Sequence, residues 1–206
     1  SCLYVIIIGL FNYTVDPYGL YRRFESDDFN QQKEGVRNKI RYVKTLEVFL
    51  RQPKTIIMGS SRVHDCINPD NPVFDEIKPA YNYGIDMARI KELKLFLKHA
   101  ILNTKLENVI IGFDFFMFNK YERVNFSFDN SLVNKKVTPL DLYFKPLFTM
   151  TALLDSVETI KASYLQNDRK EFLENGYRPG KHVFFGVKDY KKLHNYTNWV
   201  FLSSKP

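Results

Sequence analysis

One stretch of the chain, Gly59–Arg62, places two hydroxyls and a guanidinium directly after an apolar run. The run, Thr55–Met58, is typical of a buried strand, and the glycine permits the tight turn that would end it. In open α/β sheets, ligands bind just beyond such strand ends. A serine hydroxyl there can act as a nucleophile, and a guanidinium can bind an anionic group of a substrate. The stretch predicts Ser61 as a nucleophile and Ser60 and Arg62 as substrate-binding residues. Because serines also cap helices, a purely structural role for the pair stays open.

Two further polar groups end or interrupt apolar runs. Asn82 and Gly84 close a short apolar run, and Asp114 stands within the run Val109–Phe118. The carboxyl ends of neighbouring parallel strands meet at one edge of a sheet, so these groups could share a site with Ser61. A carboxylate in so apolar a run must be solvated or paired, because burying a lone charge is costly. We therefore predict that Asp114 lies at this site.

Helices and strands alternate along the part of the chain that carries these groups. Apolar residues recur at helical spacing in some segments and run without interruption in others. The predicted helices cover about 27–50, 87–103 and 150–166, and the predicted strands cover about 54–59, 80–85 and 109–118. Asp86 is the predicted N-cap of the second helix. The alternation predicts an α/β fold, with three α/β/α layers around a mostly parallel, flavodoxin-like sheet that is incomplete at the C-terminus.

The N-terminal run Cys2–Phe11 has no charged residue and admits three interpretations. It is the end of a membrane helix, the remnant of a signal peptide, or a buried strand. A spanning helix needs about 20 apolar residues, so this run alone is too short, whereas its β-branched residues favour a strand. We expect the end of a membrane anchor at 1–11 and a single α/β domain at 12–206. Its core is expected at about 54–118, with a less regular insert or cap at about 119–206.

Composition limits the classes of function. The chain has 206 residues and a formal net charge of +7, but its basic residues are scattered in pairs such as Arg22–Arg23 and Lys191–Lys192. A nucleic-acid-binding surface would show a cluster of basic residues instead. The two cysteines, Cys2 and Cys66, do not have the spacing of metal ligands. We expect no nucleic-acid partner, no metal and no cofactor.

The order of the three polar groups resembles the SGNH, or GDSL-type, hydrolase superfamily. The motifs are Gly-x-Ser at 59–61, Asn-x-Gly at 82–84 and Gly-x-Asp at 112–114. The resemblance covers about residues 2–118 and is closest to a membrane-anchored bacterial branch. That branch includes the alginate O-acetylation proteins and the D-alanyl transfer protein of teichoic acid. There, too, an N-terminal membrane segment leads to a strand that ends in Gly-Ser-Ser.

The resemblance implies a function and a role for each matching residue. It implies a serine-dependent esterase or O-acyltransferase, anchored to the cytoplasmic membrane, that acts on an extracytoplasmic glycan or cell-envelope polymer. A membrane-bound acyltransferase is an implied partner. Ser61 would be the nucleophile, and the backbone N–H groups of Ser61 and Gly84 would form the oxyanion hole. Asn82 matches the family's asparagine two positions before this glycine and is a further implied catalytic residue. Asp114 stands where the family has an asparagine, and a carboxylate donates no hydrogen bond unless it is protonated.

A general base is the missing part of this set. The family takes its histidine from an Asp-x-x-His motif near the C-terminus, and the chain has no such motif. His64 lies too close to Ser61 in the sequence and is expected on a surface loop, and Asp189 and His194 receive no role. The alternative is a non-catalytic relative that serves as a binding or scaffold subunit of a membrane-associated assembly. A third interpretation is a flavodoxin-like domain that holds phosphate at 59–62.

Overall fold

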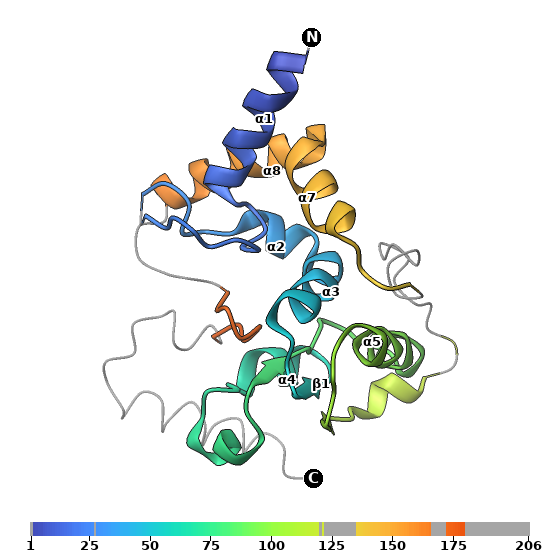
Figure 1. The fold of residues 1–206 in the computed structure, drawn as a ribbon. Helices are drawn as coiled ribbons and strands as arrows, with labels where there is room; N and C mark the ends of the chain where they lie inside the picture. The colour runs from blue at the N-terminus through green and yellow to red at the C-terminus, as the bar shows by residue number, and fades with distance from the viewer. Residues whose placement is uncertain (1, 27, 120, 122–134, 166–171, 180–206) are drawn as a thin grey trace, which may run out of the picture.

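The computed structural model describes residues 2–26, 28–119, 121, 135–165 and 172–179 (Figure 1). Its helices are α1 (Cys2–Val15), α2 (Glu34–Asn38), α3 (Ile40–Arg51), α4 (Ser61–Cys66), α5 (Ile90–Asn103), α7 (Pro139–Phe148) and α8 (Met150–Leu165), with 3-10 helices η1 (Pro72–Ile77) and η2 (Phe115–Phe118). Its strands are β1 (Thr55–Met58), β2 (Ala80–Asn82) and β3 (Asn108–Ile111).

The strands form a parallel three-stranded sheet in the order β2-β1-β3. Ile57 pairs with Asn82 on one side and with Ile110 on the other. All four residues of β1 are buried, as expected for a central strand with a neighbour on each side. The predicted α/β fold with a parallel sheet is confirmed.

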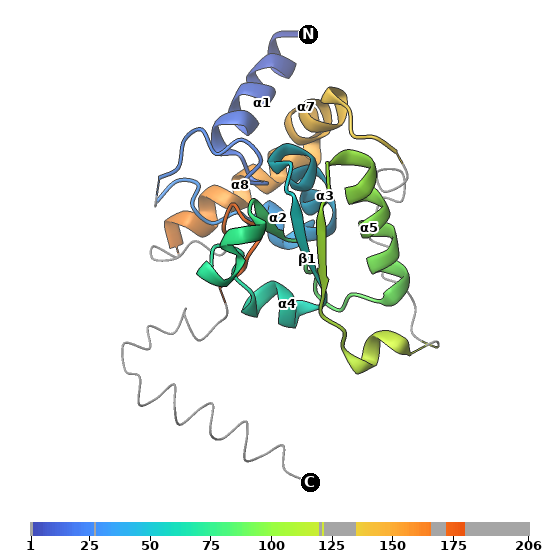
Figure 2. The same ribbon diagram turned by 60° about the horizontal axis from the view of Figure 1, so that its bottom comes forward.

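Helices α3 and α5 cover one face of this sheet. Ile56 and Met58 of β1 point into an apolar cluster with Tyr81 of β2, Val48 of α3 and Phe96 of α5. Figure 2 shows α5 running beside the sheet and α4 beginning where β1 ends. The carboxyl end of β1 therefore leads directly into α4, which carries the serine predicted to act as nucleophile.

Segment 172–179 lies along the free edge of β2, although it is distant in sequence. The Asn82 N–H donates to the Asn175 carbonyl at 2.8 Å, so the segment pairs with the strand's open side. Gly176 has a φ of +78°, and a Cβ there would lie 2.3 Å from the Asn82 carbonyl oxygen. Only glycine allows this close approach to β2.

A second cluster of buried side chains lies apart from the sheet, where α2, α3, α7 and α8 meet (Figure 1). Val36 and Val43 pack there with Leu142 and Ala152. The N-terminal run is helical, so its interpretation as a buried strand is wrong. None of the helices in the described ranges is both long enough and apolar enough to cross a membrane.

Three predicted boundaries differ from the structure. The helix predicted at 27–50 begins at Glu34 and is interrupted at Lys39, whose φ of −132° and ψ of 37° are not helical. The helix predicted after Asp86 begins at Ile90, where the Glu92 carboxylate accepts the Arg89 N–H at 3.4 Å. Asp86 is therefore not its cap. The strand predicted at 109–118 ends at Ile111 and is followed by η2.

Candidate functional site

The turn between β1 and α4 presents Ser61 beside the sheet. A Cβ at Gly59 would lie 2.3 Å from Val63 and 2.9 Å from the Gly112 carbonyl, so only glycine fits. Ser60 is the N-cap, and its hydroxyl accepts the Arg62 N–H at 3.2 Å. Ser60 thus has the capping role that serines commonly have. Ser61 is the first residue of α4 and is half-buried, and no described residue is hydrogen-bonded to its hydroxyl.

The structure brings Ser60, Arg62 and Asp114 together. The buried Ser60 hydroxyl donates to one carboxylate oxygen of Asp114, and the Arg62 guanidinium donates to the other. Burial acts to raise the pKa of Asp114, but these two contacts hold it below its usual value. The carboxylate is therefore ionised and accepts hydrogen bonds. It cannot take the donor role of the family's asparagine.

Asn82 and Gly84 hold α4 in place. The Asn82 amide nitrogen donates to the Val63 carbonyl at 2.8 Å and to the Ile67 carbonyl at 2.7 Å. Its oxygen accepts the Gly84 N–H at 2.9 Å. A Cβ at Gly84 would lie 2.7 Å from the backbone nitrogen of His64, so strand and helix pack without space between them. The Gly84 N–H and the Asn82 amide are thus engaged with each other and with α4, and this geometry gives them no role in an oxyanion hole. The Ser61 N–H lies in the first turn of α4, where it has no partner within the helix.

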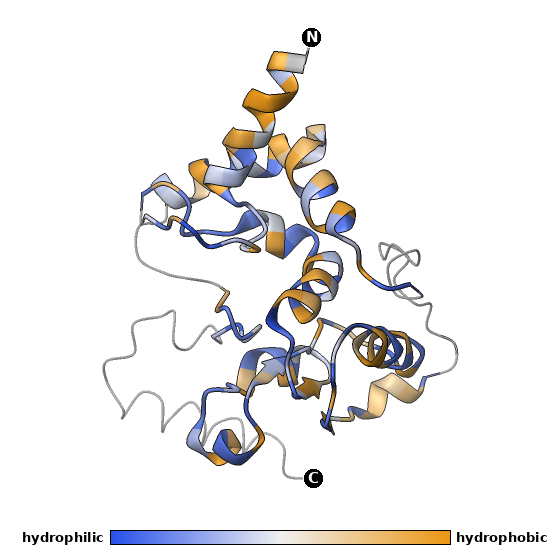
Figure 3. Cartoon of the chain, in the orientation of Figure 1, coloured by the Kyte–Doolittle hydropathy of each residue, from blue (hydrophilic) through white to orange (hydrophobic). Residues whose placement is uncertain are grey.

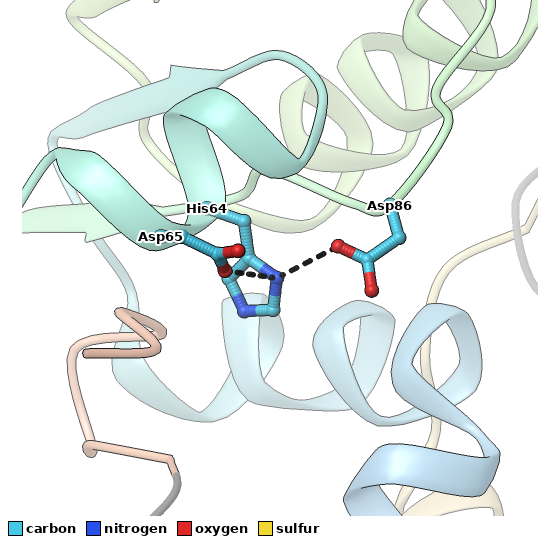
Figure 4. Close-up of side chains that lie close together, drawn as sticks. All are labelled: His64, Asp65 and Asp86. Atoms are coloured by element: carbon cyan, nitrogen blue, oxygen red, sulfur yellow. Dashed lines mark ion pairs between the residues drawn. The ribbon is translucent and has the colours of Figure 1, made fainter. Parts of the chain in front are cut away.

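A partly buried polar cluster is formed by His64 and Asp65 of α4 and by Asp86, which follows β2 (Figure 4). The expectation that His64 lies on a surface loop is wrong, because its side chain is fully buried. Its Nδ1 lies 3.6 Å from Asp86 and 3.8 Å from Asp65, and neither ring nitrogen has a hydrogen bond within the described ranges. The ring stacks instead on Phe172.

Arg178 binds both carboxylates of this cluster. Its guanidinium donates to both oxygens of Asp65, at 2.6 and 2.9 Å, and to both oxygens of Asp86, at 2.9 and 3.0 Å. Such paired contacts are among the stronger hydrogen bonds in proteins. The Arg178 N–H also donates to the His64 carbonyl at 3.1 Å. Arg178 therefore fastens segment 172–179 to α4 and to the loop after β2.

Lys44 of α3 is a second cation in this region. Its ammonium group is fully buried and donates to the carbonyls of Asn82, at 2.7 Å, and Gly176, at 2.9 Å. Burial lowers the pKa of Lys44 to about 7. Burial and the nearby Lys44 lower the pKa of His64 to about 3, so the imidazole is neutral at physiological pH.

The three side chains His64, Asp65 and Asp86 have the donor types and separations that a metal ion requires. One ligand atom from each lies within 4.8 Å of the other two. Zinc bonds of about 2.0–2.2 Å place ligand atoms about 3.3–3.6 Å apart. However, each of the four carboxylate oxygens already accepts a hydrogen bond from Arg178, whose guanidinium supplies the compensating positive charge. We therefore regard the cluster as an ion-pair network that holds segment 172–179 against the sheet.

Comparison with known proteins places the chain in no family, since no family model, no curated protein and no solved structure matches it. The resemblance to the SGNH hydrolases therefore rests on the three short motifs.

Proposed function

We propose that the chain is a serine-dependent esterase or O-acyltransferase that acts on an acylated extracytoplasmic glycan or cell-envelope polymer. It is held at the membrane through α1. The observation that carries the proposal is the position of Ser61. Its half-exposed hydroxyl stands beyond the end of the central strand and is hydrogen-bonded to no described residue. A serine in a sharp strand-to-helix turn is the usual placement of the nucleophile in α/β hydrolases.

In this mechanism, the Ser61 oxygen attacks the carbonyl carbon of the acyl ester. The bond to the alcohol breaks, the alcohol leaves with a proton, and the acyl group stays on Ser61 until water or a glycan hydroxyl takes it. The backbone N–H of Ser61 lies in the first turn of α4, where amides have no partner within the helix, and it can donate to the developing oxyanion. The exposed guanidinium of Arg62 is positioned to bind an anionic group of the polymer.

The proposal needs a base that removes the Ser61 proton. Buried His64 is neutral, and neither of its ring nitrogens has a hydrogen bond to any residue that the structure describes. His182 and His194 lie outside the described residues. The residues that the structure describes supply no base within hydrogen-bonding distance of the Ser61 hydroxyl.

Covalent labelling with a fluorophosphonate probe tests the nucleophile without knowledge of the substrate. We expect the full chain to be labelled at Ser61, Ser61→Ala to lose the label, and Ser26→Ala to keep it. Ser26 is a matched control because it lies outside the site and only its backbone takes part in hydrogen bonds described here. A folded wild-type chain that stays unlabelled would overturn the proposal.

The second candidate is a non-catalytic binding or scaffold subunit of a membrane-associated envelope assembly. The observation in its favour is that Asn82 and Gly84 are fully engaged, with no donor directed at Ser61. In such a subunit Ser61 would only begin α4. An unlabelled, folded chain that still binds an acetylated glycan would favour this alternative.

A further inference from the structure

Helix α8 buries mainly small and polar residues and exposes most of its large apolar ones, together with the Glu158–Lys161 pair. A helix on the surface of a soluble protein normally turns its apolar stripe towards the core. The buried positions of α8 are Ala152, Asp155, Ser156, Thr159 and Ser163. The large exposed apolar side chains are Met150, Leu154, Val157, Tyr164 and Leu165, between 49% and 73% exposed. The outward face of α8 therefore exposes large apolar side chains to solvent, which is unfavourable in water.

Asp155 and Ser156, two of the buried polar residues of α8, bind neighbouring segments. The Ser156 hydroxyl donates to the side-chain oxygen of Asn12 in α1 at 2.8 Å, and the Asn12 amide donates to the Leu147 carbonyl of α7 at 2.7 Å. Asp155 accepts the Tyr18 hydroxyl at 2.6 Å. Polar contacts thus join α1, α7 and α8 from within. Helices that associate in lipid use the same arrangement, because packing apolar faces together gains little there.

The first turns of α1 are uncovered on every side. Leu3, Tyr4, Val5, Ile6 and Ile7 follow one another and are each at least 50% exposed. Successive residues point about 100° apart around a helix, so five in a row face all directions. A partner protein docked alongside would cover one face, whereas lipid chains cover the whole circumference. The exposure of α1 therefore favours a bilayer over a protein partner.

Helix α7 adds an apolar stripe at the same end of the molecule. Its exposed side chains Leu140, Tyr143, Phe144 and Phe148 lie at helical spacing on one side of α7. Figure 3 shows α1 and α7 side by side, with the first turns of α1 almost wholly apolar. A Cβ at Gly9 would lie 2.3 Å from the Phe148 ring, so the two helices are in close contact.

We propose that the outer faces of α7 and α8 lie in the headgroup and acyl-chain boundary of the bilayer in which α1 is embedded. This inference rests on the proposed membrane attachment through α1. Amphipathic helices at this boundary bury their apolar face and keep charged side chains near the headgroups. Lys145 and Lys161 are exposed on α7 and α8, and their long side chains can extend to the headgroups. The domain is thus fixed in orientation by three helices.

Site-directed fluorescence in vesicles tests this orientation. The full chain, with Cys2 and Cys66 changed to serine, receives single cysteines in the variants Ile6→Cys, Phe144→Cys, Leu154→Cys or Val73→Cys. Each cysteine carries an environment-sensitive dye, and the vesicles contain phosphatidylethanolamine and phosphatidylglycerol with brominated acyl chains. Val73 is a matched control, because it is 76% exposed and apolar but belongs to η1. We expect quenching at positions 6, 144 and 154 and none at position 73.

Each other outcome overturns a defined part of the proposal. Quenching at position 6 alone would show that α1 enters the bilayer while α7 and α8 stay outside it, so the inference would fail and the attachment would stand. Quenching at none of the positions, with the chain eluting as a dimer, would make the apolar surface a contact between two copies. As a second readout, Phe144→Asp should lower the vesicle partition coefficient about tenfold, whereas Val73→Asp should leave it unchanged.

Discussion

Removal of the Arg178 guanidinium should destabilise the protein at neutral pH. The size of the effect can be worked out from the lowered pKa of Asp86. Burial acts to raise the pKa of Asp86, but His64 and Arg178 lower it from 3.8 to about 2. At about 1.4 kcal/mol per pKa unit the shift corresponds to about 2.5 kcal/mol. The Asp86 side chain is 41% exposed, so solvent screening reduces this to about 1 kcal/mol. His64 supplies part of this stabilisation, whereas Arg178 also binds Asp65, so Arg178→Gln should cost about 1–2 kcal/mol.

The assay is urea unfolding of both proteins at pH 7 and pH 3. The folded-state pKa of Asp86 is below its unfolded value, so its stabilisation is present above about pH 4 and is lost as the pH falls towards 2. The wild type should therefore lose stability on acidification more steeply than Arg178→Gln. Lys54→Gln is the control, because the Lys54–Glu107 pair is exposed on both sides and should matter little. Equal stability losses for the two variants would refute the reasoning.

Two further predictions concern residues that contact segment 172–179. Because burial lowers the pKa of Lys44 to about 7, the unfolded chain binds more protons above that pH and stability should rise by about 2 kcal/mol between pH 7 and 9. Denaturant titrations should show this rise in the wild type and not in Lys44→Met. An equal rise in both would contradict the assignment. Gly176→Ala should cost about 2–3 kcal/mol by thermal or urea unfolding, since its Cβ would collide with the Asn82 carbonyl. Gly19 also has a positive φ, but a Cβ there would come no nearer than 3.0 Å to the Arg22 guanidinium, so Gly19→Ala should cost only about 1 kcal/mol.

The sheet could be predicted because its sequence signals are local. Thr55–Met58 is a continuous apolar run, and a central parallel strand needs no alternation of polar residues. Gly59 and Ser60 follow it with turn and capping chemistry that does not depend on distant residues. The proximity of Ser60, Arg62 and Asp114 also followed from the sequence, because the ends of neighbouring parallel strands meet.

The polar cluster could not be predicted, because its decisive member comes from far along the chain. Asp86 precedes a helical segment and has the residue type of a cap, yet its carboxylate binds Arg178. His64 lies in a polar stretch typical of a loop, and it is buried only because Phe172 and Arg178 cover it. One signal was present in the sequence. Lys44 falls on the apolar side of its helix, where a charge needs a partner.

Local propensity misled at the N-terminus, and in α8 it located the helix without its orientation. The β-branched residues of Val5–Ile8 favour a strand in isolation, but a lone strand there would leave its backbone groups without partners. The helix predicted at about 150–166 is confirmed as α8, but Leu154 and Val157 are exposed, whereas Ser156 and Thr159 are buried. A helical period gives the two faces but not which face points inward, so tertiary contacts decide.

The position of Ser61 depends on residues that do no chemistry. Helix α4 has six residues, and an isolated helix of that length is not stable in water. It is held by the Asn82 amide, which donates to the Val63 carbonyl, and by the Arg178 N–H, which donates to the His64 carbonyl. Ser61 and two members of the ion-pair cluster, His64 and Asp65, therefore belong to the same short helix. A site built in this way needs segment 172–179 in place before Ser61 has a fixed geometry.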